Sequence, residues 1–148
     1  MARVFCASIF LLIAGWTCMT GTLQDLPTLI ESSMRDKEPN WRLYRTESTP
    51  RSTIYMWKSG EDTVGAEIFV TASEQAASDA FKKYIVRFNG PPKERPKDLG
   101  DEALIFQSEG FPSGSILFRK ANVLIKMSGS SMVDMRRFAT YFVELISK

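Results

Sequence analysis

The residues available for chemistry are few, because the 148-residue chain contains no histidine. Histidine is the commonest general base and metal ligand, so serine–histidine and cysteine–histidine catalysis are excluded. Carboxylates are the remaining side chains that could act as general acids and bases. Asp101 and Glu102 begin a predicted strand, and Glu61 and Asp62 occupy a predicted hairpin turn. Neighbouring strand residues point to opposite faces, so Asp101 and Glu102 are expected to serve a turn and not a shared substrate.

No pattern in the chain indicates a metal, a cofactor or a phosphate. The acidic residues do not follow the D-x-D-x-D spacing of oxygen-ligated metal sites, and the glycines do not form a phosphate-binding loop. We therefore predict no catalytic residue, no metal ligand and no cofactor, in a protein that is not an enzyme. A carboxylate-dependent hydrolase is the alternative, and it would need two acids that converge from different elements.

The N-terminus has the three parts of a secretory signal. Arg3 is followed by an apolar run from Val4 to Ala14, which then weakens into glycine and threonine residues. We predict a signal peptide over residues 1–22 and a single domain over residues 23–148. The expected location is secreted or periplasmic.

Both cysteines, Cys6 and Cys18, lie in this N-terminal segment. Its removal would leave a domain without thiols, which excludes thiol catalysis, disulfides and a cysteine-bound zinc from that domain. An uncleaved membrane anchor and lipid attachment at Cys18 are the alternatives. The net charge of +2 is too small to indicate nucleic acid. We expect no nucleic-acid partner, and no membrane span after the signal is removed.

Hydrophobic periodicity and turn residues predict three helices and six strands. Helices are expected from Asp25 to just before Pro39, from Ser73 to about Phe88, and from Ser131 to the end of the chain. Strands are expected over residues 41–47, 53–58, 63–71, 102–107, 115–119 and 123–128. The amphipathic helices need a sheet to cover. The predicted fold is α+β, an antiparallel-rich sheet with helices on one face.

The second half of the chain weakly echoes the first. Phe81 and Tyr84 match Phe138 and Tyr141, each 57 residues later. One interpretation is a pseudo-repeat of two β-β-β-α halves. Chance similarity between two hairpin–helix units is the other.

Strand alternation predicts a recognition surface on the sheet face opposite the helices. The alternating apolar residues from Val64 to Val70 are assigned to the core, and the opposite face then gathers aromatic and basic side chains. This mixture is typical of binding surfaces. The candidate ligand- or partner-binding residues are Tyr55, Trp57, Phe69, Arg119 and Lys126. The alternative is that the first helix or residues 90–98 cover this face and make it a second core.

Two short runs carry a family resemblance. Leu99-Gly100-Asp101-Glu102-Ala103, then Phe118–Val123, then the amphipathic terminal helix resemble a pattern in small exported bacterial proteins, mostly uncharacterised. Some of these are similar to extracytoplasmic sensor domains, including those of membrane-bound serine/threonine kinases. The chain differs from the kinase sensors, which typically carry disulfides, because no cysteine follows Cys18. The resemblance implies an α+β ligand-sensing or accessory domain outside the membrane, and it assigns no functional residue.

Together these observations predict an exported, non-catalytic binding or sensing domain of the bacterial envelope. A structural or assembly partner of another envelope protein is the alternative. The expected partner is an envelope protein or a small ligand.

Overall fold

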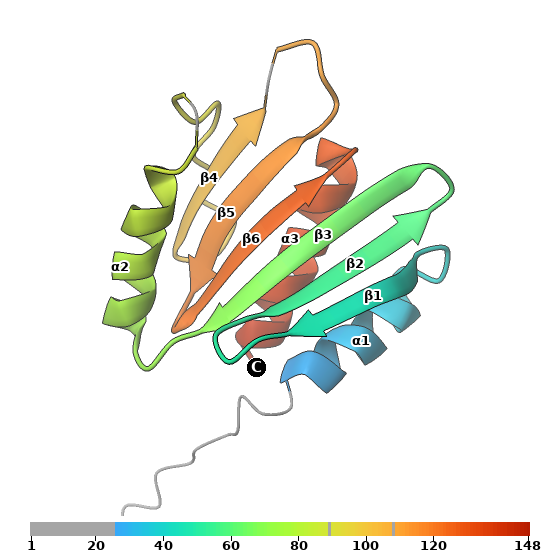
Figure 1. Ribbon diagram of the computed structural model, residues 1–148, viewed down its shortest axis with the longest axis horizontal. Coiled ribbons are helices and arrows are strands. Elements are labelled where there is room, and N and C mark those ends of the chain that lie inside the picture. The colour runs from blue at the N-terminus through green and yellow to red at the C-terminus, as the bar shows by residue number, and fades with distance from the viewer. Residues whose placement is uncertain (1–25, 89, 108) are drawn as a thin grey trace, which may run out of the picture.

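The computed structural model describes residues 26–88, 90–107 and 109–148, which form three helices and six strands (Figure 1). The helices are α1 (Leu26–Lys37), α2 (Glu74–Ile85) and α3 (Met132–Ile146). The strands are β1 (Arg42–Ser48), β2 (Thr53–Ser59), β3 (Asp62–Val70), β4 (Glu102–Gln107), β5 (Gly114–Lys120) and β6 (Val123–Gly129). The predicted signal peptide and Asp25 lie outside the described residues.

The strands form one antiparallel sheet in the order β1-β2-β3-β6-β5-β4 (Figure 1). Each half of the chain contributes a meander of three strands, and the β3–β6 pair joins the two meanders. The predicted α+β class is therefore confirmed, and the elements lie within a few residues of the expected segments.

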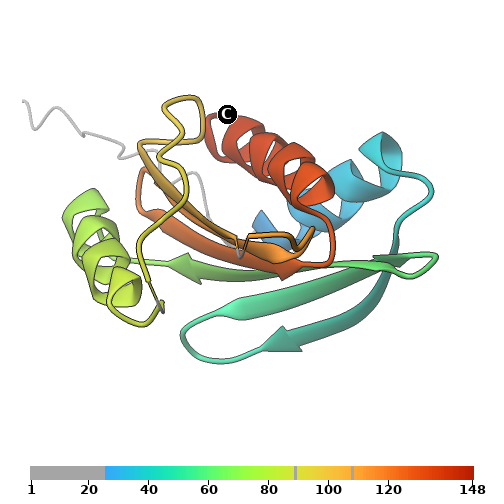
Figure 2. The same ribbon diagram turned by 90° about the horizontal axis from the view of Figure 1, so that it is seen from above.

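The helices lie on both faces of this sheet and not on one (Figure 2). Helices α1 and α3 cover one face, and α2 covers the other over the second meander. Side chains of β5 show this, because Ile116 and Phe118 join the core under α1 and α3 while Leu117 packs under α2. The expectation of helices on a single face was wrong in this respect. Strands β4, β5 and β6 are apolar on both faces, so both faces need cover.

The strand order fits the predicted pseudo-repeat, but the helices do not follow it. Ile68 lies opposite Ile125 on the two central strands, at the predicted spacing. If the two halves were true repeats, a two-fold axis normal to the sheet between Ile68 and Ile125 would exchange the two meanders. Helices α2 and α3 would then lie on the same face of the sheet. The two helices lie on opposite faces, so the repeat stays a prediction.

Two apolar cores result. The larger one lies between the sheet and helices α1 and α3, where the rings of Trp57 and Phe138 are 5.4 Å apart between centroids. The smaller one lies under α2, where Phe81 packs on the outer side of β4, β5 and β6. Phe88 extends this second core, and it stacks on Phe106 with ring centroids 4.0 Å apart.

The starts of α2 and α3 are capped as the sequence predicts. The Ser73 hydroxyl accepts from the Ala76 N–H at 3.1 Å, and the Ser131 hydroxyl accepts from the Asp134 N–H at 3.3 Å. A serine in this position satisfies an N–H group that the helix itself leaves unpaired.

Candidate functional site

The recognition surface predicted for the open sheet face does not form, because its two central aromatics are buried. Tyr55 and Trp57 are each 1% exposed, in the core shared with α1 and α3. The register gives the reason: Tyr55 lies opposite Ala66, and Trp57 lies opposite Val64. Directly opposed residues of an antiparallel pair point to the same face. The assignment of Tyr55 and Trp57 to the open face was therefore wrong.

The other predicted site residues lie on the α2 face of the sheet. Phe69 is half-buried and packs on Tyr84 of α2, with ring centroids 5.3 Å apart. Lys126 is half-buried between Glu67 and Leu117 on the neighbouring strands. These residues and Arg119 are thus separated by the sheet from Tyr55 and Trp57, so the five do not form one site.

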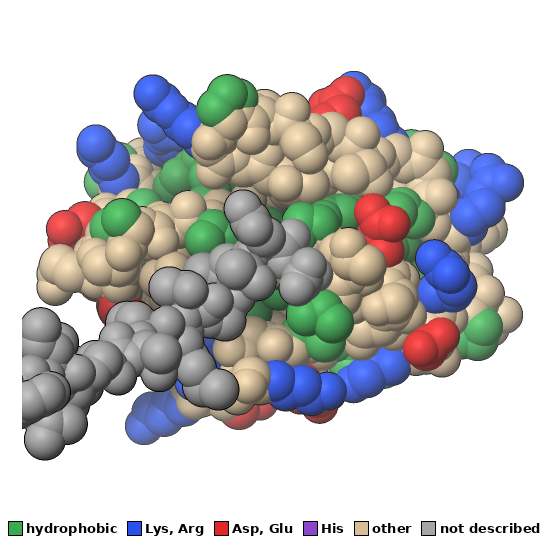
Figure 3. Space-filling view, turned by 90° about the horizontal axis from the view of Figure 1, so that it is seen from below, with side chains coloured by type: hydrophobic (Ala, Val, Ile, Leu, Met, Phe, Trp, Pro, Cys, Tyr) green, Lys and Arg blue, Asp and Glu red, His purple; other side chains and the backbone are tan. Residues whose placement is uncertain are grey.

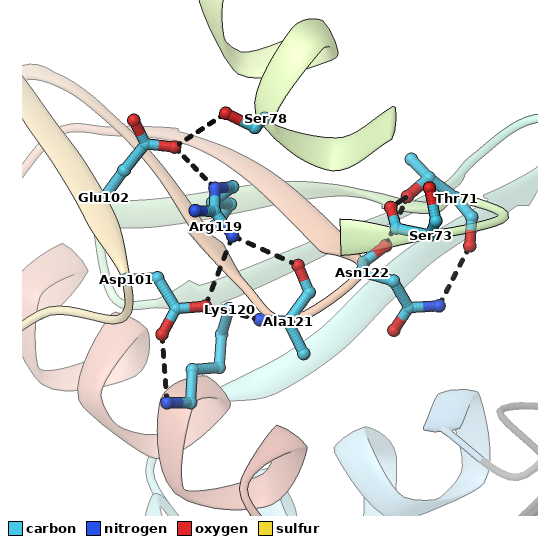
Figure 4. Close-up of polar contacts among 9 residues, drawn as sticks. All are labelled: Thr71, Ser73, Ser78, Asp101, Glu102, Arg119, Lys120, Ala121 and Asn122. Carbon is cyan, nitrogen blue, oxygen red and sulfur yellow. Dashed lines mark hydrogen bonds and ion pairs between the residues drawn. The ribbon is translucent and has the colours of Figure 1, made fainter. Parts of the chain in front are cut away.

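Arg119 joins residues 99–103 to residues 118–123, two runs singled out in the sequence (Figure 4). Its Nε donates to the Glu102 carboxylate at 2.5 Å, and its terminal nitrogen lies 3.3 Å from the Asp101 carboxylate. The Ser78 hydroxyl of α2 donates to the same Glu102 oxygen at 3.3 Å. Since the Arg119 side chain is only 15% exposed, this network stabilises the fold where β4, β5 and α2 meet.

Asp101 holds the turn between β5 and β6. Its carboxylate accepts from the Ala121 N–H at 2.7 Å and from Lys120 Nζ at 3.1 Å, and Ala121 has a φ of 50°. Burial alone would raise the pKa of Asp101, but the hydrogen bonds from Ala121 and Lys120 and the nearby cations outweigh it and lower that pKa. A glycosidase acid needs a raised pKa, so Asp101 does not suit that role in the hydrolase alternative.

Thr71 and Asn122 connect the β5–β6 turn to the segment that leads into α2 (Figure 4). The Thr71 hydroxyl donates to the Asn122 carbonyl at 2.8 Å, and Asn122 Nδ2 donates to the Thr71 carbonyl at 2.9 Å. The polar side chains of this corner thus bind one another and the backbone, as in a structural network.

A groove of about 540 Å³ lies on another side of the molecule, between α1 and β1. It falls in the usual size range of small-molecule sites, about 300–1,000 Å³. Its lining includes Glu31 and Arg35 of α1, Trp41 just before β1, Arg42 and Leu43 at the start of β1, and Trp57 of β2. The groove combines two indole rings, Trp41 and Trp57, with two arginines.

The aromatic part of the groove is held rigidly. Trp41 meets Phe138 of α3 edge-on, with ring centroids 5.1 Å apart, and Phe138 also packs against Trp57. Trp41 is half-buried, so part of its ring stays open to the groove. A ring fixed in this way loses little conformational entropy when a ligand binds.

The charged part of the groove is dominated by arginine. Arg35 and Arg42 are exposed, and no ion pair within residues 26–148, as far as they are described, includes either guanidinium. On the side that carries α1 and β1, basic side chains lie mostly around the rim, acidic side chains lie among them, and hydrophobic side chains lie between (Figure 3). Such a groove favours a ligand with an anionic group and an apolar part.

Glu31 brings one negative charge to this groove. Burial and then the charge of Glu31 raise the pKa of Tyr55 to about 12. The Tyr55 hydroxyl is buried and has no hydrogen-bond partner among the described residues. It is therefore a neutral, unsatisfied group between the sheet and α1.

Sequence reasoning missed this groove because it depends on how α1 lies beside β1. The sequence predicts Trp41 and Arg42 only as the start of a strand, and Arg35 only as part of a helix. A tryptophan with arginines 35 and 42 on either side of it in the sequence was the available signal, but periodicity does not place α1 next to an edge strand.

No known protein family, curated protein or solved structure matches this chain. In the described ranges, no three His, Cys, Asp or Glu side chains are grouped so that they could hold a metal ion. None of the described helices is long and apolar enough to cross a membrane.

Proposed function

We propose that this protein is an exported, non-catalytic ligand-binding domain of the bacterial envelope, with the groove between α1 and β1 as its binding site. The single observation that carries the site is that two exposed arginines, Arg35 and Arg42, lie beside the fixed ring of Trp41. Neither arginine forms an ion pair with a described acidic side chain. The signal-like N-terminus and the resemblance to exported sensor domains support the location.

The groove favours a ligand with one anionic group. Guanidinium groups bind carboxylates and phosphates through paired hydrogen bonds, so Arg35 and Arg42 would hold that group. Trp41 would contact an apolar segment or a sugar ring. Glu31, which lines the same groove, disfavours a second anionic group next to the first. Short peptides with one acidic side chain, uronic acids and phosphate monoesters of alcohols meet these requirements.

Intrinsic fluorescence tests this proposal directly. The tryptophans of the chain are Trp16, Trp41 and Trp57, and Trp16 lies in the predicted signal peptide. In the processed domain both remaining tryptophans line the groove. Titration of that domain with an acidic peptide, a uronic acid and a sugar phosphate is expected to give a saturable change with at least one of them.

Substitutions identify the groove as the source of the signal. Arg42→Ser is expected to weaken binding by about tenfold, since a lost charge-assisted hydrogen bond is worth about 1.5 kcal/mol or more. Arg51→Ser is the matched control, because Arg51 is exposed in the β1–β2 turn and does not line the groove. A flat titration with all three probes, or equal effects of the two substitutions, would contradict the proposal.

A further inference from the structure

The two edges of the sheet differ in how they are covered. The β4 edge is partly paired, because the Ile105 carbonyl accepts from the Lys93 N–H at 2.8 Å and the Ile105 N–H donates to the Glu94 carbonyl at 3.0 Å. Strand β1 pairs with β2 alone, and no described backbone group pairs along its outer side. An unpaired edge is a template for another strand.

The regular part of this edge carries one charge of each sign. A bulge separates Leu43 from Arg45, and the ladder then runs regularly to Ser48. Arg45 lies opposite Met56 and Glu47 lies opposite Ile54, so both charges are on the sheet face away from α1. They are exposed, and Arg45 Nε donates to Glu47 at 2.9 Å within the strand.

Charge then selects the register for a second copy. A two-fold axis normal to the sheet relates the two copies and keeps each side chain on its own face. In the antiparallel pair of β1 strands that results, one residue must therefore lie directly opposite the same residue of the second copy. Centring on Arg45 or on Glu47 would place like charges opposite each other, which is destabilising. Centring on Thr46 places each Arg45 opposite a Glu47, twice, with two threonines at the axis.

We propose that β1 is a homodimer interface, in which two copies pair antiparallel around Thr46. The pairing joins two six-stranded sheets into one and covers both free β1 edges. It keeps the α1 helices of both copies on one face, so the two α1–β1 grooves flank the dimer axis. The charges Arg45 and Glu47 then permit this partner and disfavour strands that lack the complementary pattern.

The dimer is expected to be weak, because the regular edge is short. Such an interface belongs with transient contacts that bury less than about 1,200 Å². We expect association at roughly 0.1–1 mM protein, as measured by sedimentation equilibrium on the processed protein. A protein that stays monomeric throughout this range would overturn the proposal.

Charge reversal gives the decisive test. Arg45→Glu alone and Glu47→Arg alone are each expected to weaken dimerisation by at least about tenfold, because each places like charges opposite one another. An equimolar mixture of the two variants restores both opposite-charge pairs, so it is expected to form heterodimers at the wild-type concentration range. The double variant R45E/E47R is expected to self-associate again.

Controls separate this register from an effect of net charge. Lys82→Glu on α2 and Glu61→Arg in the β2–β3 turn change the net charge by the same amounts as Arg45→Glu and Glu47→Arg. Both positions are exposed and lie away from β1, so these variants should leave dimerisation unchanged. Circular dichroism checks that each variant is folded. If the mixture associates no better than its components, the Thr46-centred pairing is wrong.

Discussion

Arg119 and Glu102 lie directly opposite each other on β5 and β4, and Arg119 Nε donates to the Glu102 carboxylate at 2.5 Å. This contact joins residues 99–103 to residues 118–123. Both runs are explained by the packing of one corner of the fold, since Asp101 holds the adjacent turn. Both segments thus have a structural role here, and ligand binding is better sought at the α1–β1 groove.

The first prediction concerns the charge of Asp101. Asp101→Asn keeps the shape but weakens the bonds to Ala121 and Lys120, and is expected to lower the free energy of unfolding by about 1–2 kcal/mol at pH 7. The folded-state pKa of Asp101 is lowered, so its contribution is present above the ordinary aspartate pKa and is lost as pH falls through the lowered value. Urea unfolding should therefore show the variant converging on wild type in acid.

Asp98→Asn is the control for this experiment, because Asp98 is exposed in the preceding loop and forms none of the described ion pairs. Its effect should stay within about 0.5 kcal/mol at every pH. A difference between Asp101→Asn and wild type that does not shrink in acid would contradict the assigned role of the carboxylate.

The second prediction concerns Gly100. Its φ is +73°, and a Cβ at this position would lie 2.4 Å from the Arg119 carbonyl oxygen. Gly100→Ala is expected to cost about 2–4 kcal/mol, from backbone strain and from displacement of β5. Gly110 has a φ of +80° but open space around it, so Gly110→Ala should cost only about 1 kcal/mol. Equal thermal midpoints of the two variants would show that the close approach is unimportant.

The sequence was sufficient to locate the elements, because their signals are local. Serines 73 and 131 cap their helices, and polar turns separate the apolar strands. The faces of β2 were not predictable in the same way. Both Ile54-Met56 and Tyr55-Trp57 alternate, and only the pairing with Val64 and Ala66 decides which pair lies in the core.

The candidate site was less predictable than the fold. Trp41 and Arg42 are close in sequence, but Arg35 belongs to the preceding helix, and the groove exists only because α1 lies beside the edge strand. The position of α1 depends on its packing against α3 and Tyr55, which is a long-range contact. Periodicity indicates that α1 has an apolar side but does not say what that side covers.

The third prediction reverses the role first expected of Trp57. On an open face its removal would leave the thermal midpoint unchanged, whereas a tryptophan that is 1% exposed lies in the core. Trp57→Ala is expected to cost about 3–5 kcal/mol. Phe111→Ala is the matched control, because Phe111 is 63% exposed and should change stability by less than about 0.5 kcal/mol. Similar denaturation midpoints for both variants would refute the burial of Trp57.

The last prediction concerns the unsatisfied hydroxyl of Tyr55. Tyr55→Phe removes a buried group that has no described partner, so it is expected to leave the free energy of unfolding unchanged at pH 7 or to raise it by up to about 1 kcal/mol. Tyr141→Phe is the control, because the Tyr141 hydroxyl donates to Glu38 at 3.1 Å. Loss of that bond should cost about 0.5–1.5 kcal/mol.

Measurements at alkaline pH test the burial of the Tyr55 hydroxyl further. Because burial and Glu31 raise the pKa of Tyr55 to about 12, the unfolded chain releases this proton near pH 10 while the folded protein retains it. Wild-type stability from this group is therefore present below pH 10 and is lost as pH rises toward about 12. Tyr55→Phe lacks this loss, so its advantage over wild type should grow across that window in denaturant melts. A clear destabilisation by Tyr55→Phe at pH 7 would instead mean that the hydroxyl has a partner, and an advantage that stays constant up to pH 12 would mean that its pKa is not raised.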